Sequence, residues 1–189
     1  MQRLDVRGLD LVYARPGSTL SPYRQIWLRP VQVSFQRDWA RAQQRATGLH
    51  VRPRDLQRIR ADLAEVVGEE VARELRRGGY ALADGPGEDV LELEVRATEL
   101  YLNSADLPSA AHVRNYTMSF GRMTLVADLR DSVTGDSVMR ILDRKIGRDY
   151  GVLRYTTRVE NTREVGIAAQ EWARALRRQL GLAGARSGR

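Results

Sequence analysis

The chain has 189 residues, of which 42% are hydrophobic and 29% charged, and its formal net charge is +7. This length fits one domain, and the hydrophobic share can build a core, which excludes wholesale disorder. Because the sequence contains no cysteine, disulfides, cysteine nucleophiles and thiolate metal sites are excluded. No apolar stretch is long enough to span a membrane as a helix.

Arginine supplies nearly all of the positive charge, since Lys145 is the one lysine among 31 basic residues. A basic chain suits nucleic acid, anionic lipid or an acidic partner. However, most arginines alternate with acidic residues on the expected helix faces, and like charges do not occur in long runs. The pattern therefore favours a solvated surface.

The first fifty residues predict strands and loops. An apolar run at 9–13 predicts a first strand, and 25–35 predict a second. The apolar parity of this second strand changes after Pro30, which indicates an edge or a bulge, and we expect a bulge. Residues 37–52 are polar and basic apart from Trp39, and we expect an irregular connection there.

The clearest helix pattern begins at Pro53, a residue suited to the first helical position. Its apolar stripe repeats at three- and four-residue spacing, and Gly78-Gly79 ends it. The stripe consists of Leu56, Ile59, Leu63, Val66, Val67, Val71 and Leu75. A short strand at 80–83 follows.

The second half of the chain predicts the longest strands. Residues 90–102 alternate apolar and polar side chains until the parity slips near Thr98 and Glu99, which suggests strong bending or a second bulge. Residues 123–145 predict a hairpin that turns at Asp131–Asp136, with Gly135 suited to a positive φ.

We expect Thr162 to cap the last helix. Its apolar stripe consists of Val165, Ala168, Ala169, Trp172, Leu176 and Leu180. The order of elements predicts one α+β domain over residues 1–182, with a frayed tail at 183–189. We expect two layers: a mostly antiparallel sheet with two amphipathic helices packed on one face.

Four stretches of the sequence resemble one bacterial family. They are Pro30-Val-Gln-Val-Ser-Phe35 ahead of Trp39; Glu74-Leu-Arg-Arg-Gly-Gly-Tyr80; Met123-Thr-Leu-Val with Asp131-Ser-Val-Thr-Gly135; and Arg158-Val-Glu-Asn-Thr162 ahead of a tryptophan-bearing helix. Over roughly residues 9–180 the chain resembles the DUF3313 family, lipoproteins of Gram-negative bacteria with no established activity.

The resemblance implies an exported protein in the cell envelope that faces the periplasm. It also implies a membrane anchor through a lipidated cysteine upstream of the residues given, with the outer membrane preferred over the inner. It supplies no catalytic residues, because the family carries no established activity.

A metal site is not expected from the ligand types present. His50 and His112 have no second histidine or carboxylate pair at ligand spacing. Asp128, Asp131 and Asp136 surround the hairpin turn, but they lack the ligand number and spacing of an EF-hand loop. Ordinary turn chemistry is therefore favoured over calcium binding.

Catalysis is likewise not favoured. The sequence contains no glycine-rich phosphate loop and no serine nucleophile elbow, and we expect no cofactor. Glu92 and Glu94 lie on one face of a strand, as a carboxylate pair would, although such a face is more often simply solvated.

Three long connections, at 37–52, 103–116 and 147–161, exceed what folding requires and combine aromatic residues with arginine. The candidate binding residues are Trp39, Arg41, Arg114, Tyr116, Tyr150, Arg154, Tyr155 and Arg158. The alternative is that these aromatic side chains hold the loops against the core.

We therefore expect a non-catalytic binding or adaptor module that contacts an envelope protein or glycan. Two other hypotheses remain: a basic module that binds nucleic acid, which is not favoured, and a hydrolase of an envelope polymer. The sequence defines neither the identity of the partner nor the oligomeric state.

Overall fold

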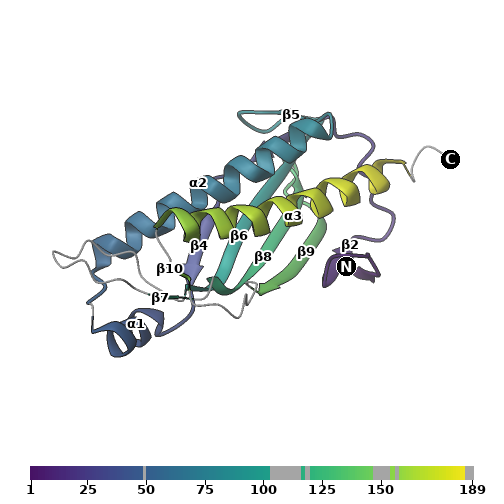
Figure 1. Cartoon of the computed structure of the whole chain (residues 1–189). Coiled ribbons are helices and arrows are strands. Elements are labelled where there is room, and N and C mark those ends of the chain that lie inside the picture. Colours follow the sequence, from purple (N-terminus) through teal and green to yellow (C-terminus); the bar gives the residue numbers. More distant parts are fainter. Residues whose placement is uncertain (49, 103–115, 118–119, 147–153, 156–157, 186–189) are drawn as a thin grey trace.

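In a computed structural model the chain forms a layer of helices on a β-sheet (Figure 1). The structure describes residues 1–48, 50–102, 116–117, 120–146, 154–155 and 158–185. The helices are α1 (Trp39–Thr47), α2 (Pro53–Arg77) and α3 (Arg158–Ala185). The strands are β1 (Gln2–Leu4), β2 (Leu11–Ala14), β3 (Gln25–Leu28), β4 (Gln32–Phe35), β5 (Ala81–Leu82), β6 (Val90–Leu102), β7 (Tyr116–Thr117), β8 (Phe120–Asp131), β9 (Ser137–Ile146) and β10 (Arg154–Tyr155).

The main sheet has eight strands in the order β1-β2-β9-β8-β6-β3-β5, and β4 also pairs with β6. The neighbours from β1 to β6 run antiparallel and include the longest ladders. β3 and β4 pair with β6 in parallel, as does β5 with β3. The sheet is therefore mixed, and the expected α+β class is confirmed.

The two long helices α2 and α3 lie side by side over one face of the sheet (Figure 1). The stripe of α2 buries Leu63, Val67 and Val71, and that of α3 buries Trp172 and Leu176. On the sheet, the side chains of Leu93, Val95, Leu125, Ala127, Leu129 and Ile141 are buried. Because this one face carries most of the burial, the expected pair of amphipathic helices on one face is confirmed.

One buried carboxylate joins the two helices. Glu74 of α2 is 1% exposed, and its oxygens face Arg77 at 2.8 Å, Arg177 at 3.1 Å and Arg174 at 3.6 Å. Arg174 and Arg177 belong to α3. Burial alone would raise the pKa of Glu74, but the hydrogen bonds from Arg77 and Arg177 outweigh it and lower that pKa.

The parity change at Pro30 is a one-residue insertion. Leu28 lies opposite Leu93 and Gln32 lies opposite Arg96, so four steps from β3 to β4 match three along β6. The extra residue restores apolar side chains to the helix-covered face beyond Pro30. The expected bulge is thereby confirmed.

The second parity slip lies within β6 itself. Thr98 pairs with Thr124 and Tyr101 with Arg122, so three steps on β6 match two on β8. Glu99, inside this interval, has a φ of 54°, an uncommon value for a residue other than glycine. This confirms the second bulge.

The hairpin of β8 and β9 also forms as expected. Asp131 stabilises its turn: Oδ1 accepts hydrogen bonds from the backbone amides of Val133 and Thr134 at 3.0 and 2.7 Å. Gly135 has a φ of 73°, which favours glycine. The Asp131 carboxylate also accepts a hydrogen bond from the Tyr23 hydroxyl at 2.9 Å. Its oxygens thus serve the turn, as the residue pattern favoured.

Three expectations at element boundaries were wrong. Residues 39–47 form α1, where we expected an irregular connection. Thr162 does not cap α3, because the helix begins at Arg158 and contains it. Threonine is a favoured N-cap residue, but tertiary context overrides such local preferences. The helix also continues to Ala185, into the stretch expected to be frayed, and the sequence analysis did not predict β1.

Within the described residues, none of the helices combines the length and apolarity needed to cross a bilayer.

Candidate functional site at the α1 end of the sheet

Helix α1 packs on the far end of β6 through Trp39. The Trp39 indole is 1% exposed, stacks on Phe35 with ring centroids 4.4 Å apart, and donates from Nε1 to the carbonyl oxygen of Leu102 at 2.7 Å. The same oxygen accepts a hydrogen bond from buried Gln43 at 3.1 Å. Trp39 therefore fixes α1 to the sheet, and its ring is not available on the surface to a partner.

Arg41 lies on the solvent side of the same helix. Its side chain is 82% exposed and pairs with Asp38 at 3.2 Å. An ion pair this exposed contributes little to stability, so the guanidinium can exchange Asp38 for another acceptor. Of the candidates on α1, Arg41 is the one available for binding.

The short ribbon of β7 and β10 joins two of the three connections that the sequence singled out. Tyr116 pairs with Tyr155 and Thr117 with Arg154, in antiparallel register. Partners in such a register are direct neighbours across the two strands. Figure 1 shows β7, β10 and α1 at the same end of the main sheet. We call α1, the β7–β10 ribbon and the adjoining residues Tyr101, Leu102 and Arg122 the α1 end.

Of the three remaining candidate binding residues, the structure describes one. Arg158 begins α3. Arg114 and Tyr150 lie outside the described residues.

One arginine of the α1 end was missed by the sequence analysis. Arg122, at the start of β8, is exposed and donates from Nη2 to Oε1 of Gln36 at 2.8 Å. Its guanidinium carbon lies 5.9 Å from the centroid of the Tyr101 ring. The only sequence signal was the alternation of β8, which places Arg122 on the polar side of that strand. The α1 end thus carries exposed arginines at Arg41 and Arg122 and a pair of register-matched tyrosines.

The two carboxylates of β6, Glu92 and Glu94, form ion pairs with arginine. Glu92 lies 3.5 Å from Arg29, and Glu94 lies 4.0 Å from both Arg96 and Arg130. Each of the two carboxylates thus has at least one arginine within 4.0 Å. This sheet face is therefore a network of ion pairs.

One buried carboxyl group has the raised pKa that acid–base catalysis requires. Burial raises the pKa of Asp143, although the Lys145 ammonium, 2.7 Å away, opposes the shift. Asp143 is 3% exposed on the helix-covered face, so a polymer substrate has no access to it. Among the described residues, no group of histidine, aspartate or glutamate is arranged to hold a metal ion.

The fold is a two-layer α+β architecture whose α1 end brings together arginine and tyrosine residues. The chain belongs to the family described as "Protein of unknown function (DUF3313)", whose model matches residues 5–176. This confirms the expected family. A comparison with curated proteins finds no match.

Two solved structures are similar to the chain. One is a candidate lipoprotein from Caulobacter crescentus CB15, with 16% identity and a TM-score of 0.42 over 90% of this chain and 95% of that one. The other is the PelC dodecamer from Paraburkholderia phytofirmans, with 12% identity and a TM-score of 0.41 over 85% of this chain and 94% of that one.

Proposed function

We propose that this chain is the folded part of a lipid-anchored protein of the cell envelope, facing the periplasm. The lipoprotein character implied by the family resemblance supports this, and the DUF3313 model covers nearly the whole chain. Metabolic labelling of the full-length gene product with radioactive palmitate tests the anchor. A labelled product in the membrane fraction is expected, and an unlabelled product in the cytosol would contradict the proposal.

We further propose that the protein is a non-catalytic binding module that contacts an envelope protein or glycan through the α1 end. The observation that carries this proposal is the pairing of Tyr116 with Tyr155 at the same end of the sheet as α1. It brings two distant segments to one place, and tyrosine and arginine are enriched at binding hot spots. Arg41 and Arg122 add exposed donors for polar groups of a partner.

Photocrosslinking in the cell tests this surface. A photoreactive residue is introduced at Arg41, Tyr116 or Tyr155 of the full-length protein, and at Val133 as a control. Val133 is 62% exposed and lies in the β8–β9 turn, at the opposite end of β8. A discrete adduct from the α1 end alone is expected, and mass spectrometry then distinguishes a protein from a glycan. Equal adducts from Val133, or none from a folded and exported protein, would contradict the proposal.

A further inference from the structure

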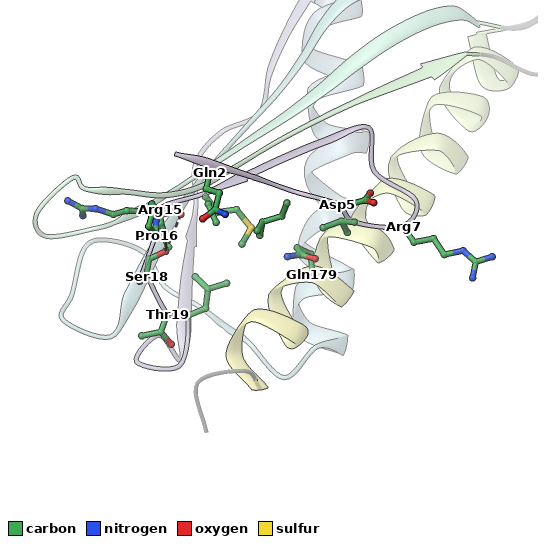
Figure 2. A pocket seen from close by; sticks show the side chains of 15 residues that line it. Gln2, Asp5, Arg7, Arg15, Pro16, Ser18, Thr19 and Gln179 are labelled. Atoms are coloured by element: carbon green, nitrogen blue, oxygen red, sulfur yellow. Dashed lines mark hydrogen bonds between the residues drawn. The ribbon is translucent and has the colours of Figure 1, made fainter. Parts of the chain in front are cut away.

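The layer of helices leaves one corner of the sheet uncovered. Gln2 pairs with Ala14 and Ala14 with Met139, so these three residues share the sheet face that α2 and α3 cover elsewhere. At this corner α3 forms one wall of a cavity, and residues 15–20, which follow β2, form the opposite wall (Figure 2). The result is a cavity of about 600 Å³, within the range of small-ligand sites.

A single buried amide faces this cavity. Gln179 of α3 lines it and is 5% exposed. Figure 2 shows its side chain projecting from the helix toward the N-terminal strands. A glutamine amide can donate and accept hydrogen bonds at the same time. The amide is therefore in place for a ligand that both donates and accepts hydrogen bonds.

The remaining lining defines the chemistry of that ligand. The apolar part of the wall consists of Leu4, Val6, Ala14, Pro16, Leu20, Val138 and Met139. The charged lining residues Asp5, Arg7 and Arg15 are all exposed. Figure 2 shows both arginine side chains directed away from the space, and Arg15 pairs with Asp136 at 2.7 Å. The interior thus suits a neutral ligand. None of the described residues that line the cavity carries an aromatic ring on which a flat ligand could stack.

The position of β1 favours a peptide over other neutral amides. β1 is the edge strand of the sheet, and two of its residues, Gln2 and Leu4, line the cavity. A peptide that pairs with an edge strand directs every second side chain to one face of the sheet. Here these side chains would lie on the face that carries Gln2 and Leu4. Such a peptide would place an aliphatic side chain over the cavity.

We propose that this cavity, the Gln179 cavity, binds an extended peptide segment with a neutral aliphatic side chain, and that Gln179 pairs with an amide of that peptide. This site is separate from the α1 end, because β1 lies at the far edge of the sheet from α1 (Figure 1). The two proposals stand or fail independently.

The test uses three small probes and nuclear magnetic resonance of the isotope-labelled protein. The probes are N-acetyl-leucine N-methylamide, N-acetylglucosamine and octanoate, which represent a peptide unit, an amide on a sugar and an acyl chain. The leucine amide is expected to bind in the millimolar range and to shift the Gln179 side-chain amide and the Met139 methyl group. Gln179→Leu should weaken this binding about tenfold, the effect of one hydrogen-bonded amide.

Two further variants separate binding from folding. Ala14→Leu fills the cavity and should abolish binding while the protein stays folded, and Gln57→Leu, on an exposed part of α2, should leave binding unchanged. Gln179→Leu should not lower the melting temperature, whereas a structural glutamine would. The proposal is overturned if N-acetylglucosamine or octanoate binds as well as the leucine amide, if no probe binds, or if Ala14→Leu leaves binding intact.

Discussion

The contact between the two long helices depends on Glu74, and its removal gives the sharpest test of the fold. Glu74→Gln keeps the shape of the side chain but removes the charge that faces Arg77, Arg174 and Arg177. Hydrogen bonds to a charged group contribute about 1.5–3 kcal/mol each. Because the three arginines are one-third to one-half exposed, solvent replaces part of this. We therefore expect a loss of about 2 kcal/mol.

A loss of this size corresponds to a fall of about 4–8 °C in melting temperature for a domain of this length. Thermal unfolding followed by circular dichroism measures it. Glu69→Gln, at an exposed position on the same helix, is the control and should change little. An unchanged melting temperature for Glu74→Gln at pH 7 would refute the reasoning that this carboxylate joins the helices.

The same variant has a defined pH dependence. The pKa of Glu74 in the folded chain lies below its ordinary value of 4.5. Its contribution to stability is therefore fully present above that value and is lost as the pH falls through the folded-state pKa. The difference between the wild type and Glu74→Gln should shrink under acid conditions, and a difference that grows as the pH falls would contradict this sign.

Three further changes test the turn, one tyrosine and the position of α1. Gly135→Ala should lower the free energy of unfolding by about 1 kcal/mol in urea titration, because its φ is positive; an unchanged midpoint would contradict this. Burial, followed by the hydrogen bond to Asp131, raises the pKa of Tyr23 to about 12, so its stabilising effect is complete below pH 10 and lost as the pH rises toward 12. In an absorbance titration, Tyr23→Phe should lack the tyrosine ionisation that the wild type shows near pH 12. If the variant instead lacks an ionisation near pH 10, the pKa of Tyr23 is not raised and the prediction is wrong. Trp39→Phe removes the bond to Leu102 and should destabilise the protein by about 1–2 kcal/mol, with faster amide exchange confined to α1; unchanged exchange there would argue against this contact.

Local patterns predicted the strands well where the signal was strict alternation. The bulges at Pro30 and Glu99 were visible because an inserted residue reverses the parity of every apolar side chain beyond it. The bounds of β6 followed from the same alternation. By contrast, Trp39 is the one large apolar residue of α1. The helix depends on Trp39 and Gln43 bonding to Leu102, far away in the sequence.

The candidate site was predictable only in part for the same reason. The sequence indicated that Tyr116 and Tyr155 belong to binding segments, but not that two short strands would pair them, because the pairing is non-local. Trp39 is a residue type enriched at binding hot spots, but in the structure it is a core residue. The residue type alone does not distinguish a binding tryptophan from a core tryptophan. Gln179 gave no signal at all, since a lone glutamine in a helix is usually solvated.

The most direct test of the proposed binding surface measures whether the two tyrosines and α1 act on one partner. The crosslinked adduct from a photoreactive residue at Arg41 is quantified in the wild-type background and in the double variant Tyr116→Ser with Tyr155→Ser, with the melting temperature of both proteins recorded. We expect the adduct to fall at least about tenfold, the effect of losing one hot-spot residue, while the fold is retained. An undiminished adduct from the folded double variant would show that the ribbon and α1 do not form one binding surface.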